Sequence, residues 1–265
     1  IAMSVKEARR MNGEIRIVPI QGIGEIPPGS DLGLLIFRAV QAQQLKLQRG
    51  DVLVVTQKIV SKAEGRVVNL DEVQPSQFAR AFAQEFNKDA AHVEVVLRES
   101  KRIVRMDHGV LISETRHGFI CANAGVDESN VGGARILTLL PLDPDRSAKE
   151  IRTRLQELAG EGSDFDIALI ISDTWGRPWR EGQVNMAIGV AGMAALTDYR
   201  GQSDPYGYQM HASMIAVADE LAGAAELAMG KIDGVPVALL RGYTYQPDAG
   251  SGKTLIRNPA TDMFR

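Results

Sequence analysis

The order of hydrophobic and polar positions along the chain predicts both strands and helices. Residues 14–20 alternate apolar and polar side chains as a half-buried strand does. Residues 52–62 and 167–172 contain apolar runs rich in β-branched residues, which favours buried strands. Residues 76–89 have apolar positions at helical spacing after Ser76, a favourable N-cap, and therefore predict an amphipathic helix.

Three further helices and several short strands complete this prediction. Ser147 and Glu150 have the spacing of a capping box and predict a helix from Ser147 to about Leu158. Residues 93–115 have the pattern of short strands separated by polar turns, so a β-rich region is expected before Asp127. The other helices are expected at 32–44 and 218–231, and a last strand at 235–242.

Composition limits the size of the fold and disfavours some partners. The chain has 265 residues, 45% of them hydrophobic, enough for a sizeable core in one large domain or two connected lobes. A formal net charge of -3 and a pI of about 5.9 give no electrostatic reason to expect nucleic acid or an anionic membrane as partner. Without a signal sequence or an apolar run of about eighteen residues, a cytoplasmic protein is expected. Residues 4–265 are expected to form one unit, after a cloning remnant at 1–3.

The cysteine and the histidines give no sign of a disulfide, a nucleophile or a metal site. Cys121 is the only cysteine, so an intramolecular disulfide and a cysteine-rich metal site are excluded. No cationic neighbour in the sequence would lower its pKa, so a packing role is favoured over a nucleophilic one. The histidines lack the spacing of a metal motif; they are His92, His108, His117 and His211.

Two aspartates among small or hydroxylated neighbours are the strongest chemical signal. Asp127 lies in ICANAGVDESNVGG (120–133), and Asp173 lies in ISDTWGRPWREG (171–182), directly before Thr174. Carboxylate and hydroxyl oxygens suit Mg²⁺ or Mn²⁺, and nearby glycines let backbone amides approach a phosphate. Each aspartate alone is better explained as a turn or cap residue. The paired contexts favour metal-assisted phosphate chemistry.

Several cations are candidates for neutralising phosphate charge. Lys62 and Arg177 have small residues nearby and are favoured for this role, and Arg180 is a further candidate. Lys58 and Arg66 are expected instead to be solvated surface charges.

Two glycine-rich segments are rejected as nucleotide motifs. Residues 250–254, GSGKT, resemble the end of a P-loop, but Pro247 stands where that motif needs its first glycine. Residues 22–29, GIGEIPPG, have prolines where a dinucleotide-binding helix would begin.

Longer motifs, in a consistent order, resemble one family across nearly the whole chain. The sequence resembles the coenzyme F420:L-glutamate ligases, which elongate the tail of a deazaflavin cofactor. The resemblance implies an α+β, mixed-sheet, two-lobed fold of the γ-glutamyl ligase type and an intertwined homodimer. The segments that carry it are PIQGIGEIPPGSDL, GDVLVVTQKIVSKAEGRVV, HGFICANAGVDESNVG, ISDTWGRPWREGQVNMAIGVAG, SDPYGYQ, VADELAGAAELAMGK and RNPATDMF.

The resemblance also implies a reaction. Family members use GTP to phosphorylate a terminal carboxylate of the deazaflavin precursor, and the amino group of L-glutamate then displaces phosphate to form an amide. Such phosphoryl transfer is catalysed mainly by positioning and charge neutralisation. The family uses Mg²⁺ or Mn²⁺, expected here as two ions per site, often with K⁺ as a stimulating ion.

Site residues follow from the resemblance by motif. Asp127, Asp173, Thr174 and Gln209 are expected to bind metal, with Asp127 and Asp173 essential for catalysis. Arg177 is added as a catalytic candidate from its charge and context, to hold substrate carboxylate or phosphate. Gln57 is expected to contact the nucleotide through its backbone. The residues expected at the GTP site are Ile23, Gly24, Glu25, Ile26, Gln57, Lys62, Asn130 and Gly207.

Two alternatives stay open at the level of sequence. A ligase of the same fold could join a different amino acid to a different carboxylate, since neither fold nor metal site determines the substrate. A noncatalytic GTP-binding protein would retain the nucleotide site without transferring phosphate. The presence of both Asp127 and Asp173 argues against the second alternative.

Overall fold

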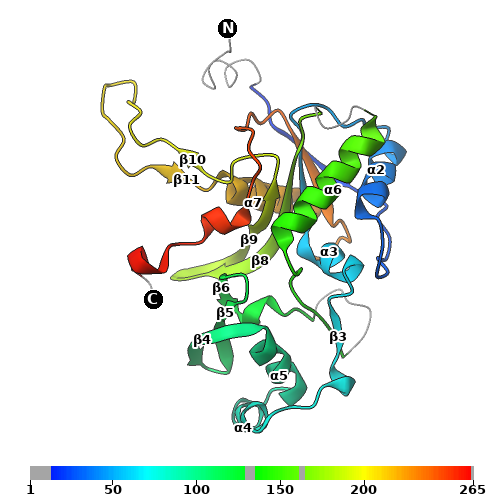
Figure 1. Cartoon of the computed structure of the whole chain (residues 1–265), viewed down its shortest axis with the longest axis vertical. Coiled ribbons are helices and arrows are strands. Elements are labelled where there is room, and N and C mark those ends of the chain that lie inside the picture. The colour runs from blue at the N-terminus through cyan, green and yellow to red at the C-terminus, as the bar shows by residue number, and fades with distance from the viewer. Residues whose placement is uncertain (1–12, 129–134, 161–164, 264–265) are drawn as a thin grey trace.

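A five-stranded mixed sheet is the centre of the fold. The computed structural model describes residues 13–128, 135–160 and 165–263. The strands β2 and β8 pair in parallel, and every other neighbouring pair in this sheet is antiparallel (Figure 1). The chain thus has the mixed α+β character expected from the resemblance. In spatial order the strands are β1 (Arg16–Ile20), β12 (Val237–Arg241), β2 (Val52–Thr56), β8 (Ala168–Arg177) and β9 (Arg180–Ala191).

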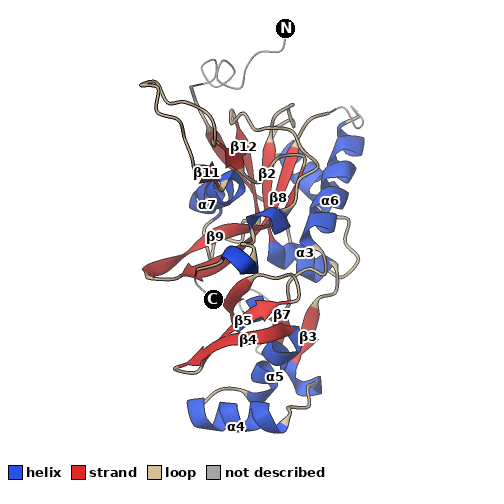
Figure 2. Ribbon diagram, turned by 60° about the vertical axis from the view of Figure 1, so that its left-hand side comes forward, coloured by secondary structure: helices blue, strands red, loops and turns tan. Residues whose placement is uncertain are grey.

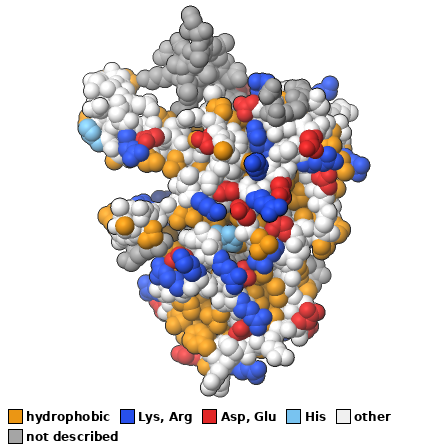
Figure 3. Space-filling model, in the orientation of Figure 1, with side chains coloured by type: hydrophobic (Ala, Val, Ile, Leu, Met, Phe, Trp, Pro, Cys, Tyr) orange, Lys and Arg blue, Asp and Glu red, His pale blue; other side chains and the backbone are white. Residues whose placement is uncertain are grey.

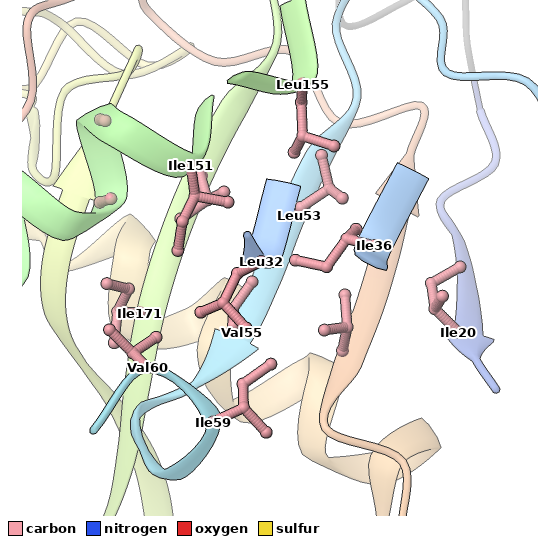
Figure 4. Close-up of a cluster of buried hydrophobic side chains, with 14 of the residues drawn as sticks. Ile20, Leu32, Ile36, Leu53, Val55, Ile59, Val60, Ile151, Leu155 and Ile171 are labelled. Atoms are coloured by element: carbon pink, nitrogen blue, oxygen red, sulfur yellow. The ribbon is translucent and has the colours of Figure 1, made fainter. Parts of the chain in front are cut away.

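Helices cover both faces of this sheet. Leu53 and Val55 of β2 join the core that packs under α2 (Leu32–Ala42) and α6 (Pro144–Ala159), shown in Figure 4. The alternate residues of β2 face the opposite core, which is covered by α7 (Val217–Met229). Burial on both faces explains why β2 reads as a continuous apolar run. Each fully buried leucine or isoleucine contributes about 1.5–3 kcal/mol of stability.

A second group of elements forms its own core below the main sheet (Figure 2). The amphipathic helix predicted after Ser76 is confirmed as α4, and the Ser76 hydroxyl accepts a hydrogen bond from Ala79 N at 3.2 Å. The elements of this region are β3 (Val67–Asn69), η1 (Leu70–Glu72), α4 (Gln77–Phe86), α5 (Ala90–Glu99), β4 (Ser100–Asp107), β5 (Val110–Thr115), β6 (Ile120–Ala122), η2 (Asn123–Gly125) and β7 (Ile136–Thr138).

The strand predicted at the start of residues 93–115 is wrong, because this segment belongs to the helix α5. Asp89 caps that helix by accepting hydrogen bonds from Ala91 N and His92 N. Packing against α4 buries one side of α5. The alternation of valine and glutamate in VEVV satisfies a strand pattern equally well, so the upstream cap is the local feature that distinguishes the two structures. The strands predicted after it are confirmed as β4 and β5.

Three predicted element boundaries also differ in the structure. The run 52–62 is a strand only as far as Thr56, after which α3 (Gln57–Ala63) begins. Helix α6 begins at Pro144, with Asp143 as its N-cap, and the Ser147 hydroxyl instead donates to Glu64. Proline suits the first helical position because it lacks the N–H that would have no partner there. Strand β8 continues beyond 172, so Asp173 lies within it and not after its end.

Cys121 has the packing role that the sequence predicted. It is buried, and burial together with the negative charge of Asp173 raises the pKa of its thiol to about 12. Among the described residues, no helix combines the length and the hydrophobicity needed to cross a bilayer.

The GSGKT segment docks against β9. It contains a single 3-10 turn, η4 (Gly252–Leu255), in place of the long helix that follows a P-loop. Gly252 N and the Ser251 hydroxyl both donate to Asp145, at 2.6 Å. A Cβ atom at Gly252 would lie 2.5 Å from the Ile188 carbonyl oxygen. The glycine therefore allows close packing of two backbones.

This packing predicts that Gly252→Ala destabilises the protein by about 1–3 kcal/mol, because the added methyl group must displace backbone. Chemical denaturation measures the change in the free energy of unfolding. Gly13→Ala is the matched control, since nothing lies within 4 Å of a Cβ at Gly13. Equal stability of the two variants would show that η4 does not pack tightly on β9.

Candidate functional site

The two predicted aspartates lie close together near the carboxyl end of β2. Thr56, the last residue of β2, pairs with Ser172 of the parallel strand β8, and Asp173 follows directly. Asp127 reaches the same region because its backbone pairs with Thr138 of β7. Lys58, in the first turn of α3, forms an ion pair with Asp127, with Nζ and Oδ2 2.9 Å apart. The negative charge of Asp127 and the positive charge of Lys58 both act on Asp173.

Asp173 is a partly buried carboxyl group that accepts hydrogen bonds from two donors. Burial raises its pKa to about 6, and the nearby negative charge of Asp127 adds to this effect. Hydrogen bonds from the Trp175 indole Nε1 and from Thr174 N, each 2.8 Å long, oppose the increase. A cation bound between the two carboxylates would relieve their repulsion, as metal-binding carboxylate pairs require.

Thr174 is oriented by a chain of buried hydrogen bonds. Its hydroxyl donates to Asn185 Oδ1 at 2.7 Å, and Asn185 Nδ2 donates to the Glu226 carboxylate at 2.8 Å. An ionised Glu226 carboxylate can only accept hydrogen bonds, so the Asn185 amide turns its nitrogen toward Glu226. The amide oxygen then faces Thr174 and accepts from the Thr174 hydroxyl. The single proton of Thr174 is used toward Asn185, and its oxygen accepts from a cationic donor. The Lys231 ammonium lies 3.4 Å from that oxygen.

Sequence reasoning missed Asn185, Glu226 and Lys231. Glu226 and Lys231 lie more than 40 residues from Thr174 along the chain, and Glu226 looks like an ordinary polar position of the helix α7. No local motif marks them. Pairing of β8 with β9 places Asn185 opposite Thr174, so the signal that identifies it is strand register.

The expectation that Lys58 and Arg66 are solvated surface charges was wrong. Only 15% of the Lys58 side chain is exposed, and it is paired with Asp127. The Arg66 side chain is 20% exposed, donates to Glu99 at 2.7 Å and also contacts the Leu140 carbonyl oxygen. The position of Lys58 directly after a buried strand could have indicated its role, because ligand contacts gather at strand ends.

The predicted GTP loop and Lys62 come together. The Lys62 ammonium contacts the Glu25 carboxylate at 2.6 Å. Gln57 is 1% exposed, and its side-chain oxygen accepts a hydrogen bond from Ser61, so the side chain is turned inward and only its backbone is suited to contact a nucleotide. Ile26 likewise packs into the core. Gly24 of the same loop leaves open space around its Cα, and Ile23 packs at the margin of the core.

Other predicted ligands lie elsewhere. Gly207 and Gln209 belong to an arm between β10 (Thr197–Asp198) and β11 (Met214–Ile215), which projects from the body in Figures 1 and 2. Gln209 pairs with Ser203 within this arm. Asn130 lies outside the described residues.

Arg177 lines a cavity of about 910 Å³ next to this site, and its Nη2 atom donates to the Glu181 carbonyl oxygen. Arg180, the first residue of β9, is exposed and is not part of that lining. The cavity also includes Trp175, whose indole is bonded to Asp173.

The donor set fits a divalent cation that is partly bound by its substrate. Within the described part of the chain, no group of three or more histidine, cysteine, aspartate or glutamate side chains is arranged to hold a metal. Two carboxylates and one hydroxyl are instead available, at Asp127, Asp173 and Thr174. Mg²⁺ bound through one or two carboxylates takes its remaining oxygen ligands from phosphates and water.

Comparison with known proteins agrees with the resemblance found in the sequence. The family model described as F420-0:Gamma-glutamyl ligase matches residues 22–242. The chain is 45% identical over 255 residues to the coenzyme F420:L-glutamate ligase of Methanothermobacter thermautotrophicus, covering 95% of this chain and 99% of that protein. It is 44% identical over 256 residues to the enzyme of that name from Methanopyrus kandleri, covering 95% of this chain and 98% of that protein. The chain therefore belongs to the F420-0:gamma-glutamyl ligase family.

Proposed function

We propose that this protein is a GTP-dependent ligase that adds L-glutamate to the tail of the coenzyme F420 precursor. One observation carries the proposal: Asp127, Asp173 and the hydroxyl of Thr174 gather beside Lys58, next to a large cavity. This donor set is suited to a metal-bound triphosphate. The relatives are named as coenzyme F420:L-glutamate ligases, which supports the choice of acceptor and amino acid.

The proposed reaction has two steps. A carboxylate oxygen of the acceptor attacks the γ-phosphorus of GTP, which forms an acyl phosphate and releases GDP. The amino group of L-glutamate then attacks the acyl carbon, inorganic phosphate leaves with the bonding electron pair, and the nitrogen loses a proton. Activation is needed because a free carboxylate is a poor electrophile. The protein contributes mainly by holding the reacting groups in line and by neutralising charge.

The residues have distinct parts in this scheme. Asp127, Asp173 and Thr174 would hold Mg²⁺ or Mn²⁺, which would neutralise charge on the transferring phosphate; two ions, with K⁺ as a further activator, belong to the proposal. Lys58 and Lys62 supply positive charge beside the phosphates. Arg177 would hold an anionic group of the substrate.

The proposal includes an intertwined homodimer of two-lobed subunits, each spanning residues 4–265. Gln209 lies on the projecting arm, whose contacts among the described residues do not join it to Asp173. An arm exchanged between subunits would bring Gly207 and Gln209 to the partner's site. The exposed apolar side chains of the arm support this, with Tyr206 97% and Tyr208 61% exposed.

Mass spectrometry tests the activity directly. The purified protein is incubated with the glutamate-free deazaflavin precursor, L-glutamate, Mn²⁺, K⁺ and either GTP or ATP. We expect a GTP-dependent gain of one or more glutamyl units. Hydrolysis of GTP without a mass gain would point to a ligase for a different carboxylate or amino acid. If neither reaction occurs, the result favours the noncatalytic GTP-binding alternative.

Asp173→Asn is expected to lower kcat by at least about 100-fold, because it removes negative charge at the metal while keeping the size of the side chain. Steady-state kinetics measures the loss, and denaturation checks that the variant folds. Asp248→Asn is the control, because this exposed aspartate lies outside the proposed site and asparagine keeps the side-chain oxygen that accepts from Gly250 N. Near-normal turnover of Asp173→Asn would contradict the proposed role.

The orientation of Thr174 gives a separate prediction. Glu226→Leu removes the acceptor for Asn185 and should weaken Mn²⁺ binding in the presence of GDP by about tenfold, as measured by electron paramagnetic resonance. Glu226→Gln keeps an oxygen that can accept from Asn185 and should weaken it less than about threefold. Equal weakening in both variants would mean that the charge of Glu226 matters and not its orienting hydrogen bond.

A further inference from the structure

The cavity beside Asp173 is a groove bounded by three parts of the fold. Its walls are the β8–β9 hairpin, the sheet β4–β5–β6 and the segment 255–262, which lie near one another in Figures 1 and 2. Its volume is about 910 Å³, at the upper end of the range typical of small-molecule sites. We call it the acceptor groove; the lining residues used below are Arg105, Phe119, Trp175, Arg177, Trp179 and Arg257.

Aromatic side chains form much of the wall. The rings of Phe119 and Trp175 have centroids 5.2 Å apart and are tilted by 58°. Trp179 is 82% exposed in the turn of the β8–β9 hairpin, where its φ of 59° is in the left-handed region. That conformation is uncommon for a large side chain and is concentrated at functional sites. Exposed aromatic faces of this kind bind planar rings by stacking.

One end of the groove meets the proposed phosphoryl-transfer site. The indole Nε1 of Trp175 donates to Asp173 at 2.8 Å, while the same residue lines the groove. Trp175 thus contacts both the groove and Asp173.

Charge along the groove favours an anionic chain. Its lining includes the guanidinium groups of Arg105, Arg177 and Arg257 and two carboxylates, Asp219 and Asp262; Arg105 also pairs with Asp107, which lies outside the lining. The carboxylate of Asp219 already accepts a hydrogen bond from Ala187 N. Among the described residues, the buried Nε of Arg177 donates to no acceptor. A carboxylate or phosphate oxygen would satisfy this donor with a charge-assisted hydrogen bond.

The geometry points to the acceptor groove as the binding site of the molecule that receives glutamate, a planar aromatic ring system with an anionic chain. The ring lies against Trp179 and the Phe119–Trp175 pair, and the chain extends past Arg177 toward Asp173. This inference rests on the proposed function for the identity of the acceptor. It assigns the aromatic and arginine side chains a role that the metal and nucleotide sites do not explain.

Intrinsic fluorescence tests the assignment, because the chain has 2 tryptophans and both line the groove. Titration of the wild-type protein with the glutamate-free deazaflavin precursor is expected to quench tryptophan emission with saturation. Trp179→Ala and Arg105→Met should each raise the Kd of the precursor by about tenfold, measured by equilibrium dialysis, and leave the Kd of GTP within about twofold.

Arg102→Met is the matched control. Arg102 and Arg105 lie on the same strand and each pairs with a carboxylate, Glu114 and Asp107 respectively, but only Arg105 lines the groove. Substitution of Arg102 should leave the Kd of the precursor within about twofold.

The outcomes separate this inference from the proposed function. Unchanged precursor affinity in Trp179→Ala and Arg105→Met, with normal ligation by the wild type, would place the acceptor elsewhere and overturn the inference alone. In another outcome, tryptophan emission changes when the protein is diluted and stays constant when the precursor is added. That result would show that a second copy of the chain covers the groove, and it would also overturn the inference. Saturable precursor binding that is weaker in both variants supports the groove. Absence of glutamate addition by the wild type refutes the proposed function and leaves this inference standing.

Discussion

The parallel pairing of β2 with β8 is the contact on which the candidate site depends. Parallel neighbours run in the same direction and Thr56 pairs with Ser172, so the chain leaves β2 into α3 beside Ser172 and Asp173. Helices cover both faces, as buried parallel strands require, and this core holds β2 and β8 in register. Because of that register the charge of Lys58 acts on Asp173, although the two are more than 100 residues apart in the sequence.

Burial of charge is the main energetic cost of this arrangement. Asp173 is partly buried and lies near Asp127, and both effects raise its pKa. Lys58 and two hydrogen-bond donors offset part of that cost. A site that keeps like charges close despite the cost is typical of cation binding and phosphate chemistry. The buried chain from Glu226 through Asn185 to Thr174 adds a defined orientation, which an exposed hydroxyl would lack.

Much of the fold was predictable where the spacing of apolar residues fits only a helix or only a strand. The helix α4 has both a cap and an amphipathic pattern, and the strands β2 and β12 are short apolar runs, so these elements were expected correctly. The prediction was wrong where two patterns compete. The segment VEVV of α5 fits the apolar spacing of a helix and of a strand, and its burial against α4 favours the helix.

The sequence by itself determined the chemistry that is available and the family to which the chain belongs. Asp127, Asp173 and Thr174 were recognisable because their neighbours are small, polar and local in the chain. Only the tertiary structure decided how these groups are arranged. It placed Lys58 against Asp127, Asn185 and Glu226 behind Thr174, and aromatic and arginine side chains in one groove. The physical reason is that these contacts depend on strand register and on packing between distant segments, which no local pattern of residues encodes.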